Sequence, residues 1–155
     1  MIRAATPADA AQIAAIWNYA IRETTITFNP DEKSTAEVAA LTAQACLVWE
    51  KGGRIMGFAR YFQFRGGAGY RFTCEHTIML HPDAQGQGGG RQLQLALCAH
   101  AKDAGMHTMF AGCSGDNPGA VPFHAALGFE KVATLRQVGF KFDKWIDLIL
   151  MQKHL

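Results

Sequence analysis

The sequence predicts a mixed α+β layer architecture, folded as one domain over residues 1–155. The length is that of an ordinary single domain and leaves no room for two independent cores. Hydrophobic residues make up 49% of the chain and charged residues 18%, so the chain has enough apolar side chains to bury a core. The hydrophobic period is helical near the N-terminus and then changes to strand-like alternation, and both kinds of element recur further along the chain.

Helical signals dominate before residue 45, after a short edge strand that we expect at residues 2–4. A hydroxyl at Thr6 followed by Pro7 is typical of a helix start. Apolar residues then recur at helical spacing as far as Ala20, which predicts that one helix face packs inward. Residues 34–37, Ser-Thr-Ala-Glu, form a capping-box pattern that opens a second, shorter helix.

The rest of the chain combines strands with two more helices. Residues 51–54, Lys-Gly-Gly-Arg, predict a hairpin turn. Gly105 and Gly128 are typical of residues that end helices. We expect strands at residues 46–50, 55–64, 70–80, 108–113, 129–138 and 145–151, and helices at 91–104 and 118–127.

Composition excludes several classes of protein. The formal charge of +2 comes from scattered lysines and arginines, whereas a nucleic-acid-binding protein normally clusters them, so no nucleic-acid partner is expected. No run of residues approaches the roughly 18 apolar residues of a membrane span, and the N-terminus does not resemble a signal peptide. We therefore expect a soluble cytoplasmic protein without a membrane partner. The four cysteines stand singly and are interpreted as free, buried thiols, with no metal site.

A glycine-rich turn joins the third long strand to the third helix. Four of the five residues at 86–90 are glycine, and Arg91 follows them. Glycines let several backbone N–H groups converge at a helix N-terminus, where the helix dipole favours an anion, so the turn is predicted to bind a phosphate or pyrophosphate. A flexible turn without a ligand is the alternative. The turn is neither a Walker motif, which needs Gly-Lys-Ser/Thr, nor a Rossmann fingerprint, which needs a parallel βαβ unit.

Two motifs carry a resemblance to a known family. Residues 85–90, Gln-Gly-Gln-Gly-Gly-Gly, resemble the Q/R-x-x-G-x-G/A motif of the GNAT superfamily of acyl-CoA N-acyltransferases, and residues 117–129 resemble that family's second signature. The resemblance covers essentially the whole chain. It implies the GNAT fold, with a central mixed, mostly antiparallel sheet flanked by helices, and it implies acetyl-CoA as co-substrate. The residues that it implies for coenzyme binding are Ile78, Met79, Leu80, Gln85, Gly86, Gln87, Gly88, Gly89, Gly90, Arg91 and Asn117.

Residues 24–28, 75–78 and 138–148 look like the phosphinothricin and methionine sulfoximine acetyltransferase branch of this family. That similarity implies acetylation of the α-amine of a small, glutamate-like amino acid. It also implies a homodimer in which the C-terminal segment around residues 141–147 partly closes the pocket. Gln85 stands where many relatives carry arginine, and Gly89 replaces an aliphatic residue, so we expect a turn with one cation fewer and a looser structure.

Acetyl transfer to an amine requires a base, because a protonated amine cannot attack. Glu75 lies in the middle of a predicted strand, and the resemblance assigns it as the general base; a solvated, outward position is the alternative. His124 stands where many relatives carry a tyrosine acid. It could protonate the departing thiolate or orient water, and a helix-surface histidine is the alternative. No acetyl-enzyme is expected, because strand alternation points Cys74 away from the Glu75 face.

Further residues are implied to flank the acceptor site. Asn117 also fits an N-cap before Pro118. Two other functions stay open: an acetyltransferase for polyamines or protein N-termini, and a non-catalytic acyl-CoA-binding sensor domain, which would have no working base. Phe28 is a candidate for the core or the pocket wall, and Arg71, on the strand of Glu75, is a candidate partner for a substrate carboxylate or else a surface arginine. The residues that the resemblance implies around the acceptor are Arg65, Gly66, Gly67, Glu75, His76 and Thr77.

Overall fold

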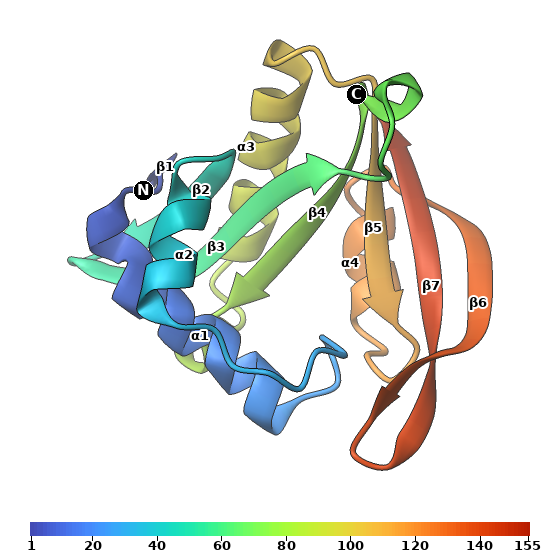
Figure 1. Cartoon of the computed structure of the whole chain (residues 1–155). Helices are drawn as coiled ribbons and strands as arrows, with labels where there is room; N and C mark the ends of the chain where they lie inside the picture. Colours follow the sequence, from blue (N-terminus) through green and yellow to red (C-terminus); the bar gives the residue numbers. More distant parts are fainter.

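Seven strands form one mixed sheet in the computed structural model, which describes residues 1–155 (Figure 1). The strand order is β1-β2-β3-β4-β5-β7-β6, and only β4 and β5 are parallel. The predicted mixed, mostly antiparallel sheet is confirmed. The strands are β1 Ile2–Ala4, β2 Cys46–Lys51, β3 Arg54–Gln63, β4 Thr73–Leu80, β5 Thr108–Ser114, β6 Glu130–Lys141 and β7 Lys144–His154. The helices are α1 Ala10–Glu23, α2 Thr35–Thr42, α3 Gly89–Asp103 and α4 Ala120–Ala125, with 3₁₀ turns at Pro7–Asp9, Ala68–Tyr70 and Pro82–Ala84.

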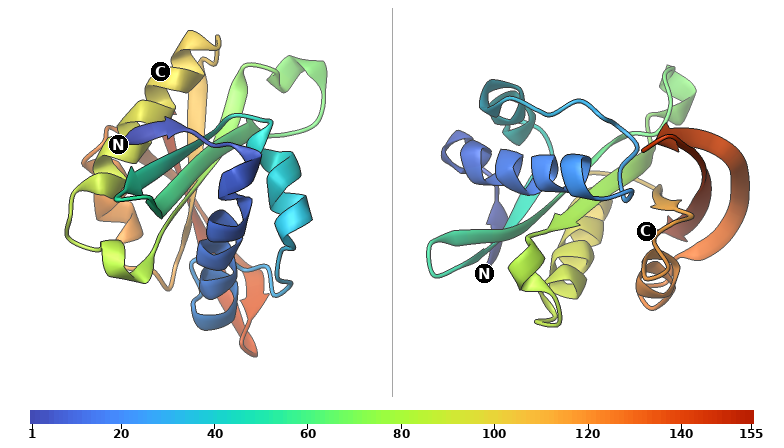
Figure 2. Two further views of the ribbon diagram at one scale, coloured as in Figure 1. Left: turned by 90° about the vertical axis from the view of Figure 1, so that its left-hand side faces the viewer. Right: turned by 90° about the horizontal axis from the view of Figure 1, so that it is seen from below.

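Helices cover both faces of the sheet: α1 and α2 lie on one face, and α3 and α4 lie on the other (Figure 2). Two separate cores result. Ile13 of α1 packs with Phe58 of β3 in the first core, and Leu93 of α3 packs in the second. Because strand side chains alternate between faces, β4 contributes Met79 to the first core and Cys74 to the second. All four cysteines are free and buried, as predicted.

The two parallel strands separate soon after they pair. β4 and β5 pair from Thr73 and Thr108 only as far as His76 and Ala111, and beyond that point they diverge (Figure 1). β4 stays paired with β3 as far as Leu80, so each of the diverging strands keeps one edge without a strand partner. Backbone N–H and C=O groups need hydrogen-bond partners, and these two edges must find theirs in water or in a ligand.

Most predicted helix starts and turns are confirmed. Ser34 caps α2 by accepting a hydrogen bond from the Glu37 amide at 3.1 Å. Gly52 and Gly53 adopt φ of 59° and 78° in the hairpin turn between β2 and β3, and Gly105 adopts φ of 91° just after α3. Glycine adopts positive φ without the steric cost that a side chain brings. The hairpin turn and the end of α3 therefore follow from the local preference of their glycines.

Several element boundaries differ from the predictions. β4 begins at Thr73 rather than at residue 70, because residues 68–70 form a 3₁₀ turn. α4 is shorter than residues 118–127: the Ala120 amide donates to the Asn117 carbonyl at 3.2 Å in a turn before the helix, and Gly119 holds the N-cap position. The predicted N-cap role of Asn117 is therefore wrong. β6 and β7 form a longer hairpin than expected, closed at Phe142 and Asp143. None of the helices is long and apolar enough to cross a membrane.

Candidate active site

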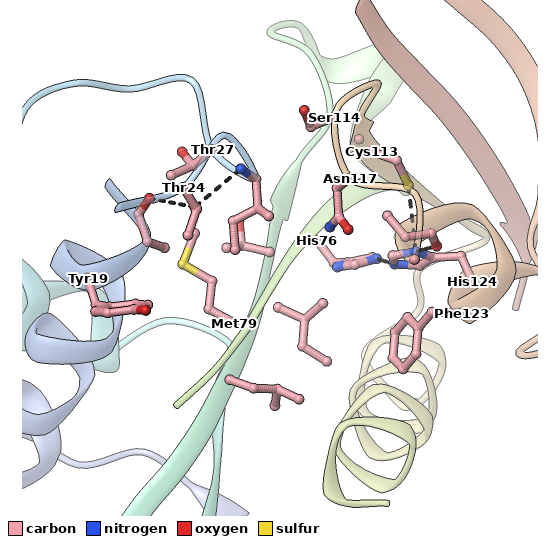
Figure 3. A pocket seen from close by; sticks show the side chains of 18 of the residues that line it. Tyr19, Thr24, Thr27, His76, Met79, Cys113, Ser114, Asn117, Phe123 and His124 are labelled. Carbon is pink, nitrogen blue, oxygen red and sulfur yellow. Dashed lines mark hydrogen bonds between the residues drawn. The ribbon is translucent and has the colours of Figure 1, made fainter. Parts of the chain in front are cut away.

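A cavity of about 660 Å³ opens where β4 and β5 diverge. The end of α1 and the loop after it form one wall, and the region around α4 forms the opposite wall (Figure 3). The cavity reaches both faces of the sheet, since it is lined by Glu75 and by its neighbour His76. No lysine or arginine lines it, and Glu75 is its one acidic side chain. The predicted site residues that line it are Glu75, His76, Thr77, Ile78, Met79, Leu80, Gln85, Asn117 and His124.

The glycine turn leaves backbone donors free at the start of α3. Gly86 and Gly88 adopt φ of 75° and 76°, and a Cβ built on either would meet no atom within 4 Å. The Gln92 amide is bonded to the Gly88 carbonyl at 3.3 Å, whereas the amides of residues 86–91 donate to no group of the protein. Free amides at a helix N-terminus form a site for an anion, and the exposed Arg91 lies in this first turn.

Two contacts at this turn were not predicted from the sequence. A Cβ on Gly89 would lie 2.3 Å from the Trp49 ring. Trp49 thus fills the space beside Gly89, and the expectation of a looser structure at this residue is wrong. Lys51 reaches across from the β2–β3 hairpin and donates to the Gln87 side-chain oxygen at 3.0 Å. A cation from another element therefore lies at the turn in which Gln85 replaces arginine.

The diverging edge of β4 presents backbone groups to the cavity. β3 bonds with the backbone of Thr73 and of His81, and residues of an antiparallel strand face a given partner at every second position. The N–H and C=O groups of Ile78 and Leu80 therefore point to the other side, into the gap. Asn117 faces this edge from the β5 side with its carboxamide in the cavity (Figure 3). These groups provide hydrogen-bond donors and acceptors for an extended ligand.

Glu75 lies at the point where the strands separate, on the face covered by α1 and α2. Its side chain is half-buried, and burial raises the pKa of its carboxyl group. No other cause shifts this pKa, so no cation is paired with the carboxylate. On β5, a Cβ built on Gly112 would lie 3.8 Å from Glu75 Oε2, and glycine leaves this side of the carboxylate open. The solvated, outward position considered from the sequence is not observed.

His76 and His124 form a stacked pair on the opposite face of the sheet. Their Nε2 atoms are 3.0 Å apart, and their ring centroids are 5.0 Å apart. His124 Nδ1 lies 2.7 Å from the Ala120 carbonyl oxygen and 3.6 Å from the Cys113 sulfur. Burial lowers the pKa of both imidazoles, so both are neutral near pH 7. His124 is therefore buried and engaged at both nitrogens, and it is not a surface histidine.

One side of the cavity is closed by the loop after α1. Thr24, Ile26 and Thr27 line the cavity. The buried Lys141 of β6 holds this loop by donating to the carbonyl oxygens of Thr24 and Thr27 at 2.7 and 2.8 Å. Phe28 instead packs on Gly139, where a Cβ would lie 2.5 Å from its ring, and does not line the cavity.

Four residues implied for the acceptor site lie elsewhere. The β3–β4 loop that holds them is at the end of β4 where the strand is still paired with β5, away from the point where the two strands diverge (Figure 1). Arg71 is exposed, donates to the Ala68 carbonyl at 2.8 Å and covers the Phe72 ring, which agrees with the surface arginine considered from the sequence. Of the predicted site residues, Phe28 and residues 86–91 also do not line the cavity, and those held by this loop are Arg65, Gly66, Gly67 and Arg71.

Comparisons with known proteins agree with this arrangement. The model of the Acetyltransferase (GNAT) family matches residues 13–129. The chain is 39% identical to L-amino acid N-acyltransferase MnaT of Escherichia coli, covering 99% of this chain and 93% of that protein. It is 37% identical to L-methionine sulfoximine/L-methionine sulfone acetyltransferase of Salmonella typhimurium, covering 99% and 94%. It is 36% identical to Phosphinothricin N-acetyltransferase of Alcaligenes faecalis, covering 99% and 82%.

A solved structure gives the same result at the level of the fold. An acetyltransferase from Salmonella typhimurium with its cofactor acetyl-CoA matches this structure with a TM-score of 0.96 at 36% identity, covering 100% of this chain and 93% of that chain. Sequence motifs, sheet topology and full-length similarity therefore lead to one conclusion. The chain belongs to the GNAT family of acetyltransferases and is an acetyl-CoA-dependent N-acetyltransferase.

Proposed function

We propose that this enzyme acetylates the α-amine of a small amino acid of the methionine sulfoximine or phosphinothricin type. The observation that carries the proposal is the unpaired carboxylate of Glu75. It lies in a small cavity that is lined by no lysine, no arginine and no other acidic side chain. An ammonium group fits beside this carboxylate. The names of the relatives support the same acceptor class: one acts on L-amino acids, one on methionine sulfoximine and one on phosphinothricin.

The coenzyme fits along the diverging edge of β4. Acetyl-CoA supplies an acetyl group that is activated as a thioester. The free amides of residues 86–91 suit its pyrophosphate. The backbone groups of Ile78 and Leu80 and the Asn117 carboxamide suit the amides of its pantetheine arm. These assignments place the reactive end of the arm near His76, where the strands meet.

Glu75 is the general base in this proposal. Burial raises the pKa of its carboxyl group, which makes the carboxylate a stronger base than that of an exposed glutamate. It removes a proton from the bound ammonium and leaves a neutral amine that can attack. Because a thiol has a pKa of about 8.5, the thiolate is a good leaving group, and the reaction depends more on this base than on an acid.

His124 is a positioning residue in this proposal. A carbonyl oxygen only accepts hydrogen bonds, so His124 Nδ1 must donate to Ala120 O. In the neutral ring Nε2 then has no proton, and this atom already accepts from His76. Neither nitrogen of His124 is left with a proton for a thiolate in the cavity, so the expected role as general acid has no support in these hydrogen bonds.

The carboxylate of an amino-acid substrate would have to be bound without a cation from the cavity wall. The groups available near the acceptor side are hydroxyls, among them those of Tyr19, Thr24 and Thr27, together with backbone amides. Such a site selects by size and hydrogen bonding. It offers a polyamine only one carboxylate, that of Glu75, although polyamine sites normally need several.

The acceptor class is tested by measuring thiol release at fixed acetyl-CoA over a panel of amines. We expect methionine sulfoximine or phosphinothricin to give the highest kcat/KM, by at least about tenfold over spermidine and over a peptide with a free N-terminus. A tenfold ratio corresponds to about 1.4 kcal/mol of transition-state stabilisation. Preference for the polyamine or the peptide would overturn the proposal, and no thiol release with any amine would favour a binding-only domain.

The role of Glu75 is tested with Glu75→Gln, which keeps the shape of the side chain and removes the proton acceptor. We expect kcat to fall by at least about 10²-fold at neutral pH. Wild-type kcat should fall as pH drops through the raised pKa of Glu75, because protonation removes the base. The deficit of the variant should shrink as pH rises, since the amine then arrives deprotonated.

Glu130→Gln, an exposed carboxylate at the start of β6, is the matched control and should leave kcat unchanged. If Glu75→Gln kept more than about a tenth of wild-type kcat, another group would have to be the general base.

We further propose a homodimer that is formed through the β6–β7 hairpin. Its apolar side chains are unusually exposed, with Phe142 57% and Trp145 63% accessible. Phe140 and Trp145 lie side by side, with ring centroids 4.8 Å apart. Large exposed aromatic groups are typical of protein interfaces. Lys141 connects the same hairpin to the loop after α1, so a second copy on this surface would also stabilise the wall of the cavity.

The dimer is tested by light scattering combined with gel filtration. We expect a mass of roughly twice the 16.9 kDa of one chain, and a shift toward the monomer in Trp145→Arg, which places a charge in the interface. Leu95→Arg, at an exposed apolar position on α3, is the control and should remain a dimer. A mass of one chain at all concentrations would refute the proposal.

A further inference from the structure

One buried polar atom beside the cavity has no partner in the protein. His76 is only 7% accessible, and its Nδ1 makes no hydrogen bond. His76 is also the last residue of β4 that pairs with β5. A buried polar atom without a partner is costly and calls for an explanation, which in an active site is often a ligand.

The hydrogen bonds of the pair determine which atoms carry protons. The Ala120 carbonyl requires a proton on His124 Nδ1, which leaves His124 Nε2 as an acceptor. His124 Nε2 lies 3.0 Å from His76 Nε2, so the latter must carry a proton and donate it. A neutral His76 with a proton on Nε2 has a lone pair on Nδ1. The Ala120 carbonyl thus determines, through the ring of His124, that Nδ1 of His76 is a hydrogen-bond acceptor.

His76 lines the cavity where the thiol end of the coenzyme arrives, if the coenzyme binds as proposed above. The arm leaves the glycine turn and follows the free backbone edge of Leu80 and Ile78 toward the meeting point of the strands. Figure 3 shows the His76 ring beside that of His124, with Asn117 close by, and all three residues line the cavity. Glu75 points to the other face of the sheet, so the amine and the coenzyme approach from different sides.

We propose that His76 Nδ1 accepts a hydrogen bond from the thiol end of the pantetheine arm, and that His124 holds His76 in the tautomer that makes this possible. Two donors are available at that end: the last amide N–H, which acetyl-CoA and coenzyme A share, and the thiol S–H, which only coenzyme A has. His76 is then a coenzyme-binding residue, in place of the acceptor-binding role implied by the sequence resemblance.

Two substitutions separate the two nitrogens of His76. His76→Asn keeps an acceptor oxygen at the position of Nδ1 and loses the Nε2 proton. His76→Gln extends to the position of Nε2 and has no acceptor at the position of Nδ1. Affinity is measured by calorimetry for acetyl-CoA, for coenzyme A and for adenosine 3′,5′-bisphosphate, which lacks the arm and therefore reports whether the nucleotide end of the site is still folded.

We expect His76→Gln to weaken coenzyme A binding about five- to tenfold, the effect of one lost hydrogen bond, and to leave adenosine 3′,5′-bisphosphate binding unchanged. His76→Asn should bind coenzyme A within about twofold of the wild type. An equal loss for acetyl-CoA identifies the amide as the donor, and a loss confined to coenzyme A identifies the thiol. Unchanged coenzyme affinity in His76→Gln, or a change only in the KM of the amine, would overturn the proposal.

Nuclear magnetic resonance of the wild type, labelled with ¹⁵N in histidine, tests the tautomer without any substitution. We expect His76 to carry its proton on Nε2, and the Nδ1 resonance to move when coenzyme A is added but not when adenosine 3′,5′-bisphosphate is added. A proton on Nδ1 in the free enzyme would contradict the proposal. If coenzyme A did not bind the wild type at all, the proposed function would fail, whereas normal binding without an effect at His76 would remove only this inference.

Discussion

The site depends on the short pairing of β4 with β5. Four residue pairs hold the two parallel strands together, and after His76 and Ala111 they separate. If the pairing continued, the sheet would be closed and the backbone edge of Ile78 and Leu80 would be used within the protein. Because it stops, a cavity crosses the sheet and has a free polar edge. α3 begins at the open end of the same gap, and its unpaired amides add an anion site to this edge.

Because side chains alternate along a strand, the ionisable side chains of the site lie on the two opposite faces of the sheet. Glu75 and His76 are neighbours on β4, and each reaches the cavity from its own side of the sheet. The α1 side holds a carboxylate whose pKa burial raises. The α4 side holds two imidazoles that burial keeps neutral. In the proposed reaction, the base for the amine and a neutral, hydrogen-bonding wall for the coenzyme thus lie close together without competing for the same proton.

Local sequence signals predicted much of this arrangement, because the chemistry of those parts is local. Glycines at 86–90 require no tertiary contact to indicate an anion-binding turn, and the positive φ of Gly86 and Gly88 agrees with that role. Alternation along β4 was enough to place Cys74 in the core and Glu75 on the other face. The family resemblance supplied what spacing alone does not, namely the coenzyme and the role expected of Glu75.

Contacts between distant segments could not be predicted in the same way. The approach of His124 to His76 depends on where a short α4 packs on the sheet, and no spacing between the two residues indicates it. The contact of Lys51 with the glycine turn and the hydrogen bonds of Lys141 to the loop after α1 depend equally on tertiary placement. Arg71 was assigned to the acceptor site because it shares a segment with Glu75, but the segment turns before β4 begins, and Arg71 stays at the opposite end.

The central claim is that the coenzyme completes the free edge of β4, and amide hydrogen exchange measures this most directly. Exchange is followed residue by residue by nuclear magnetic resonance, with and without coenzyme A. We expect the amides of Ile78, Leu80 and residues 86–91 to exchange rapidly in the free enzyme and to become protected on binding, while the amide of Thr77, which faces β3, does not change. Protection confined to residues outside the gap between β4 and β5, or Ile78 and Leu80 amides that are already protected in the free enzyme, would contradict it.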